Sequence, residues 1–144
     1  AIISILAAPA SFMNAALVMK YGMKLLATIG FALQIIFAII TILIINQDFI
    51  SMEWLLVIFI SWSVIAFFLK GLYFGNLNAL AMEPMGEIAG MASAIIGASA
   101  TMLGILIAIP IGLAFNGTAA PVLFGYITCS SLALILMLTK SNNN

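Results

Sequence analysis

The sequence predicts an all-α fold, a polytopic bundle of about five transmembrane helices. Hydrophobic residues make up 66% of the chain, and only four basic and four acidic side chains interrupt them. So few polar side chains cannot cover a surface that faces water. The apolar residues also gather into stretches of about 20 residues, the length that an α-helix needs to cross a bilayer. Together these observations indicate an integral membrane protein.

The first predicted segment covers residues 1–19 and is interrupted by Pro9 and Asn14. No initiator Met begins the chain, and Ala1 opens directly into an apolar run without the basic flank of a signal peptide. We therefore expect the sequence to be a fragment of a longer protein. The start of this first segment is expected to lie outside it.

A short basic loop joins the first segment to the second, which covers residues 25–45. The loop contains Lys20, Gly22 and Lys24, and cations around a glycine are typical of short loops at the cytoplasmic surface. The second segment has Gln34 as its one polar interruption and ends where Asn46 begins a polar stretch.

The third predicted segment is unusually long and covers residues 54–82. At 1.5 Å per residue such a helix would be about 40 Å long, so it must tilt, kink or project from the bilayer. Pro84 is expected to end it, because the residue before a proline disfavours the helical conformation. Glu83 to Gly86 then predict a tight turn into the fourth segment, with Gly86 giving the chain freedom to reverse.

The fourth and fifth segments cover residues 88–115 and 121–138. Glu87 is expected in the first turn of the fourth, where the helix dipole favours an anion. Small residues then recur at spacings of three and four, a pattern that lets another helix approach closely in a membrane. This predicted helix-packing stripe consists of Gly90, Ser93, Gly97, Thr101, Gly104, Ala108 and Gly112.

The distribution of lysines predicts an orientation in the membrane. With five crossings, Lys20, Lys24 and Lys140 all fall on one side, whereas the opposite loops carry Asp48 and Glu53. Cytoplasmic loops are enriched in cations, so the side that carries the lysines is assigned to the cytoplasm. The C-terminus is therefore expected to be cytoplasmic.

The joint pattern of turns and small residues resembles a known family. The run from Ala79 to Ala94, followed by Gly97, Gly104 and the Asn116-Gly-Thr-Ala-Ala-Pro121 loop, is similar to the late C-terminal half of a major facilitator superfamily transporter. The nearest subgroup is the Bcr/CflA type of multidrug efflux proteins. Lys20 to Lys24 resembles a degenerate form of that family's loop between helices eight and nine, and departures occur at Met19, Glu87 and Met91.

The resemblance implies that the chain holds part of helix eight and all of helices nine to twelve. Such transporters rock two six-helix bundles about a site near the midplane of the membrane. The implied partners are the bilayer, the missing N-terminal bundle and a small amphipathic, drug-like substrate. The implied location is the bacterial inner membrane, with the proton gradient as energy source and no bound cofactor. The predicted substrate-pathway candidates are Trp62, Lys70, Tyr73, Phe74, Asn76 and Asn78.

Lys70 is the sharpest candidate, since a lysine near the middle of a bilayer costs about 2.5 to 3.5 kcal/mol on insertion scales. A cavity role, a structural ion pair and a side chain that snorkels to the surface all stay open. For Asn76 and Asn78, hydrogen bonds that fasten neighbouring helices are favoured over contact with substrate. For Trp62, Tyr73 and Phe74, packing against lipid or protein is the simpler interpretation of each.

Other classes of function find little support in the sequence. The balanced charge offers no clustered cations for nucleic acid. The chain has no His and a single cysteine, Cys129, so neither a metal site nor a catalytic constellation is expected. The remaining alternative is a self-contained small membrane protein that acts as a structural or assembly subunit of a complex.

Overall fold

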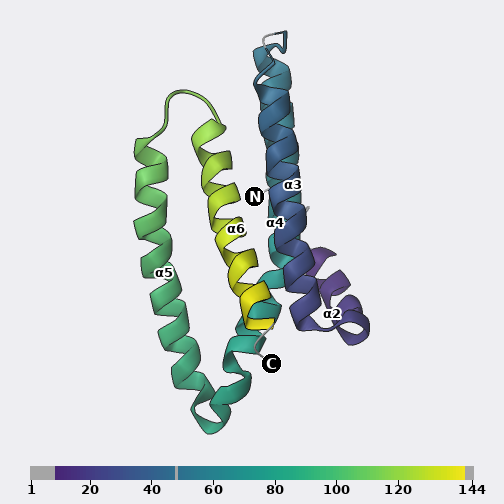
Figure 1. The fold of residues 1–144 in the computed structure, drawn as a ribbon, viewed down its shortest axis with the longest axis vertical. Helices are drawn as coiled ribbons and strands as arrows, with labels where there is room; N and C mark the ends of the chain where they lie inside the picture. The colour runs from purple at the N-terminus through teal and green to yellow at the C-terminus, as the bar shows by residue number, and fades with distance from the viewer. Residues whose placement is uncertain (1–8, 48, 142–144) are drawn as a thin grey trace.

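Helices form every regular element in the part of the chain that the structure describes, residues 9–47 and 49–141 (Figure 1). The structure is a computed structural model. It confirms the predicted all-α fold class. The elements, in chain order, are α2 (Pro9–Tyr21), α3 (Met23–Ile45), α4 (Met52–Met82), the 3-10 helix η1 (Glu83–Ile88), α5 (Ala89–Leu113) and α6 (Ala120–Ser141).

Three helical stretches of the described chain are long and apolar enough to cross a membrane: Met23–Ile45, Met52–Leu113 and Ala120–Thr139. The second stretch holds 62 residues and includes both α4 and α5. These two helices run in opposite directions, because the chain reverses between them at the lower end of the molecule (Figure 1). The predicted membrane class is therefore supported. Of the first predicted segment, residues 1–8 lie outside the described residues and residues 9–19 belong to the short α2.

Two glycines make the turns that the sequence predicts at this lower end. Gly22, between α2 and α3, has φ 80° and ψ 156°. Gly86, inside η1, has φ 48° and ψ −122°. Positive φ is strained for residues with a Cβ, so glycine is the residue that allows both reversals.

The join between α4 and α5 differs in detail from the prediction. The chain does not leave the helical conformation at Pro84 but continues as the six-residue η1, with Pro84 in the first turn, where its missing N–H is not needed. The expected place of Glu87 in the first turn of the next helix is wrong, because Glu87 belongs to η1 and α5 begins at Ala89 without an acid in its first turn.

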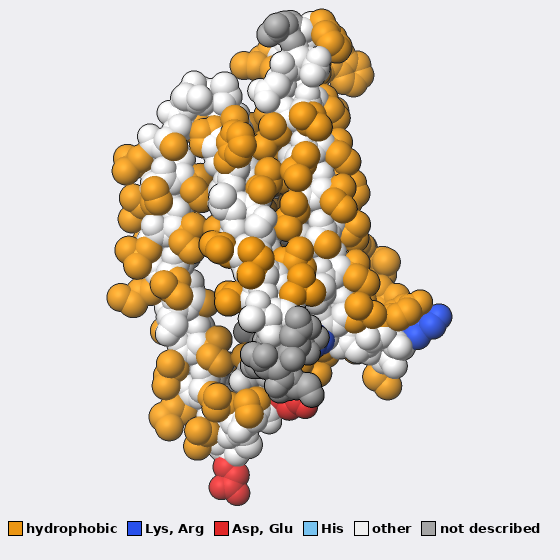
Figure 2. Space-filling view, viewed as in Figure 1, with side chains coloured by type: hydrophobic (Ala, Val, Ile, Leu, Met, Phe, Trp, Pro, Cys, Tyr) orange, Lys and Arg blue, Asp and Glu red, His pale blue; other side chains and the backbone are white. Residues whose placement is uncertain are grey.

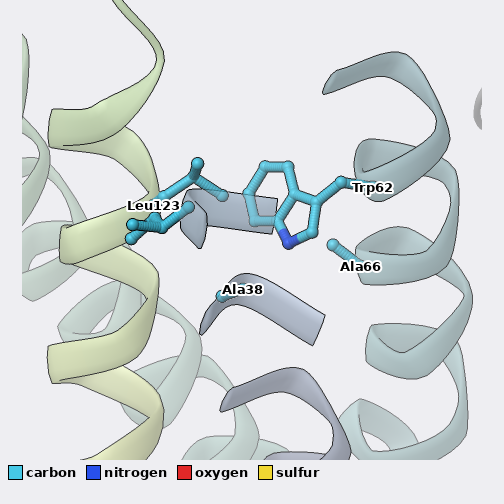
Figure 3. Close-up of a cluster of buried hydrophobic side chains, with 5 residues drawn as sticks. Ala38, Trp62, Ala66 and Leu123 are labelled. Carbon is cyan, nitrogen blue, oxygen red and sulfur yellow. The ribbon is translucent and has the colours of Figure 1, made fainter. Parts of the chain in front are cut away.

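α3 is the central helix of the bundle. It packs against α4 along one side and against α6 along another, while α2 contacts the lower part of α4 (Figure 1). One apolar cluster joins α3, α4 and α6 around Trp62, and Ala38, Ala66 and Leu123 are among its members (Figure 3). A second cluster closer to the turns contains Ala27, Phe31, Leu69 and Tyr73.

The outer faces of the helices are strongly apolar. Figure 2 shows hydrophobic side chains along the whole length of the visible face, with acidic side chains at its lower end. Many large side chains are exposed, such as Leu113 at 83% and Met102 at 71%. Continuous apolar surface of this kind marks contact with lipid or with another protein.

Hydroxyl side chains inside these helices bond to their own helix. Thr41 donates to the carbonyl of Phe37 at 2.8 Å, Ser61 to Val57 at 2.7 Å and Ser63 to Phe59 at 2.8 Å. No buried side-chain nitrogen or oxygen among the described residues lacks a partner. This satisfies the main demand of a bilayer, which offers polar groups no water to bond with.

Candidate functional site

The candidate site is built on α4, whose buried residues follow one face of the helix. Trp62, Ala66, Leu69, Tyr73 and Asn76 are spaced by three or four residues and are all buried. Residues at this spacing lie on one side of an α-helix. The buried face of α4 is therefore a continuous strip that turns from apolar to polar towards the lower end.

Tyr73 sits at the centre of this strip and is fixed from two directions. Its hydroxyl donates a 2.9 Å hydrogen bond to the side-chain oxygen of Gln34 on α3, and both side chains are buried. Its ring packs on Phe31, with ring centroids 4.5 Å apart. A Cβ built on Gly30 would lie 2.7 Å from Cδ1 of Tyr73, so only glycine lets α3 and α4 approach this closely here.

Asn76 forms the second polar contact of the strip. It exchanges amide hydrogen bonds with Asn14 of α2, at 3.1 Å in one direction and 2.8 Å in the other. Asn76 also donates to the carbonyl of Leu72 at 2.9 Å. The pair fastens α2 to α4, which is the arrangement that the sequence favours for Asn76.

Removing the Asn14 to Asn76 contact is expected to weaken the docking of α2. We predict that Asn14→Leu and Asn76→Leu each destabilise the bundle, and that their double-mutant cycle gives a coupling of about 1 kcal/mol, as for hydrogen bonds between membrane helices. Equilibrium unfolding in mixed micelles measures it. Asn78→Leu is the control on the same helix, and additive effects of Asn14 and Asn76 would contradict the prediction.

The six substrate-pathway candidates fall into two groups. Trp62, Tyr73 and Asn76 are buried between helices, whereas Lys70 and Phe74 are exposed and Asn78 is half-buried. The ammonium of Lys70 lies 5.7 Å from the centre of the Phe74 ring, within reach of a cation–π contact. Lys70 and Phe74 thus form a small exposed pair one helical turn apart, next to the buried strip.

The predicted stripe of small residues on α5 lies open. All seven of its residues are exposed, and a Cβ built on Gly90, Gly97, Gly104 or Gly112 would meet nothing within 4 Å. Thr101 bonds only to its own helix, at the carbonyl of Gly97. Within α5, Ala92 is the one buried residue. Nothing in the described chain covers this face.

α5 makes its close contact with α6 through a residue outside the stripe. The side chain of Ile111 packs against the backbone of Gly125, where an added Cβ would overlap it. The loop between these helices is shaped by Asn116, whose side chain accepts hydrogen bonds from the backbone and the hydroxyl of Thr118. The stripe itself is left free by this contact.

Gln34 and Asn14 were not among the sequence candidates, although both belong to the polar contacts. The available signal was their position as isolated polar residues within apolar segments, since such residues in membrane helices generally find a partner on another helix. Spacing alone could not pair Gln34 with Tyr73, which is 39 residues away.

The predicted basic loop lies at the lower end of the molecule, around the turn at Gly22. The ammonium of Lys20 lies over the Tyr21 ring, 5.1 Å from its centre, and Lys24 is half-buried at the start of α3.

No group of three or more His, Cys, Asp or Glu in the described chain could hold a metal ion. Comparisons with protein-family models, with curated proteins and with solved structures found no match to this chain.

Proposed function

We propose that this chain belongs to a secondary active transporter that exports small amphipathic compounds by alternating access, in exchange for protons. The observation that carries the proposal is the uncovered stripe of small residues on α5, which begins directly after the turn at Gly86. A face of this kind is suited to close contact with another helix in a membrane. In the proposal, the N-terminal bundle of the same transporter packs against this face of α5. The protein lies in a bacterial inner membrane with its C-terminus in the cytoplasm.

The composition of α4 supports a role beside the substrate pathway. Its buried strip fixes the helix to α3 and α2, while Lys70 and Phe74 remain exposed next to it. A cation beside an aromatic ring is a suitable lining for amphipathic molecules. The high cost of a lysine in an apolar segment favours a function for Lys70 over a passive position.

A second candidate function is an assembly subunit of a membrane complex. The same open face of α5 favours it, because a partner protein could pack there as well as a second bundle could. An assembly subunit predicts no movement of small molecules.

An efflux assay separates the two candidate functions. The complete gene that encodes this chain is expressed in bacteria that lack their own drug pumps, and several unrelated amphipathic dyes are loaded into the cells. The transporter predicts faster dye loss with the gene than with an empty vector, and this difference should vanish when an ionophore collapses the proton gradient. Equal dye loss in cells that hold the protein in their membrane would contradict transport.

Lys70→Met in the complete protein is expected to lower the efflux rate by about tenfold to a hundredfold, because one charge-assisted contact is worth about 1.5 to 3 kcal/mol. Lys70→Arg retains the charge and should retain part of the rate. Expression of each variant is checked by immunoblot of the membrane fraction. Unchanged efflux in Lys70→Met at equal expression would exclude a role of this side chain in the pathway.

A further inference from the structure

Two adjoining cavities open at the lower end of the bundle, where α3 begins and where α4 and α6 approach their ends. Their volumes are about 580 Å³ and 500 Å³, within the usual range of small-molecule sites. Both are lined by Lys24, Leu80, Glu83 and Met137. The two cavities therefore form one continuous surface around these four residues.

This surface carries one charge of each sign from the described chain. Thr28 donates a hydrogen bond to the backbone carbonyl of Lys24 at 2.9 Å, and both Lys24 and Glu83 line both cavities. Lys24 is half-buried and Glu83 is exposed. Both charges are thus available to a ligand that brings a negative and a positive group together.

The remaining lining is mostly apolar. Leu80 and Met137 contribute to both cavities, and Leu25 and Leu138 contribute to the first. The charged residues lie where apolar helices end, since Lys24 is the second residue of α3 and Glu83 directly follows α4. In a bilayer this is the depth at which lipid headgroups meet hydrocarbon chains.

We propose that this surface is a binding site for a phospholipid with a phosphoethanolamine headgroup. The Lys24 ammonium contacts the phosphate, and the Glu83 carboxylate accepts a hydrogen bond from the primary ammonium of the headgroup. The acyl chains follow the apolar walls formed by Leu80 and Met137. The combination of both charges and apolar walls selects a zwitterionic lipid over a soluble phosphate.

The three common headgroups differ in what they offer to this pair of charges. Phosphoethanolamine supplies a phosphate and a cation with N–H donors, phosphocholine supplies a phosphate and a cation without N–H, and phosphoglycerol supplies a phosphate and neutral O–H donors but no cation. A carboxylate at Glu83 therefore favours phosphoethanolamine, whereas Lys24 contributes to all three. This inference does not rest on transport, and it holds for an assembly subunit as well.

The site is tested by native mass spectrometry of the purified chain in detergent, titrated with dioleoyl lipids that carry each of the three headgroups. The wild-type chain is expected to bind phosphatidylethanolamine most tightly. Glu83→Gln should weaken that binding about tenfold, the effect of one lost charge-assisted contact, and leave phosphatidylglycerol binding unweakened. Lys24→Gln should weaken binding of all three lipids.

Matched controls lie next to both residues. Lys20→Gln and Glu87→Gln remove charges from the same turns, but neither residue lines the cavities, so both variants should bind like the wild type. Circular dichroism confirms that each variant keeps its helix content. The proposal is overturned if the wild type binds the three lipids equally, if Glu83→Gln keeps its preference for phosphatidylethanolamine, or if the control variants lose as much binding as the test variants.

Discussion

Trp62→Ala is expected to lower the free energy of unfolding by about 3 kcal/mol, the lower end of the range for large aromatic residues in protein cores. The indole is buried in a cluster with Ala38, Ala66 and Leu123. It meets the Tyr126 ring edge-on, with the two ring centroids 5.0 Å apart. In a bilayer the lost stabilisation comes mainly from packing contacts, since lipid rather than water surrounds the separated helices. Unfolding in mixed micelles, followed by circular dichroism, measures the change.

The second tryptophan of the chain provides the control. Trp54 is 63% exposed at the start of α4 and contributes to no buried cluster. Trp54→Ala is therefore expected to change the free energy of unfolding by less than about 0.5 kcal/mol. Equal losses from the two substitutions would show that the cluster around Trp62 does not hold α3, α4 and α6 together.

Gly30→Leu is expected to destabilise the bundle by about 1 to 3 kcal/mol, the usual cost of overpacking. A side chain at residue 30 would meet the Tyr73 ring, which cannot move aside without losing its hydrogen bond to Gln34 and its contact with Phe31. The same unfolding assay measures the loss, and a shift in tyrosine fluorescence should accompany it.

Gly104→Leu is the matched control for this substitution. Gly104 is also a helical glycine, but a Cβ there meets nothing within 4 Å. Its replacement should leave the stability of the purified chain nearly unchanged. If the open face of α5 packs against a second bundle, as we propose, the same replacement should impair function of the complete protein by blocking that face. A stable Gly30→Leu variant, with unfolding like that of Gly104→Leu, would contradict the close approach of α3 and α4.

The class and the turns of this fold could be predicted from the sequence. Apolar length indicates membrane helices, and α3 and α4 end at Ile45 and Met82 as the sequence predicts. Gly22 and Gly86 stand where the chain must reverse, and both adopt positive φ. Such features are local, so they can be recognised without knowledge of the neighbouring helices.

The packing faces could not be predicted in the same way. In water, the buried face of a helix is apolar and its outer face is polar, but in lipid both faces are apolar. Trp62 and Phe74 therefore look alike in the sequence, although one is buried and the other is exposed. The pairing of Asn14 with Asn76 spans 62 residues and depends on where α2 docks, which no local pattern encodes.

Everted membrane vesicles test most directly whether the complete protein exchanges a drug for protons. Vesicles that contain the complete gene product are energised until an acridine dye reports an acidic interior, and an amphipathic drug is then added. We predict that the drug dissipates the pH gradient, and that Lys70→Met weakens this response. An unaltered gradient, in vesicles that hold the inserted wild-type protein and with several unrelated drugs, would contradict it.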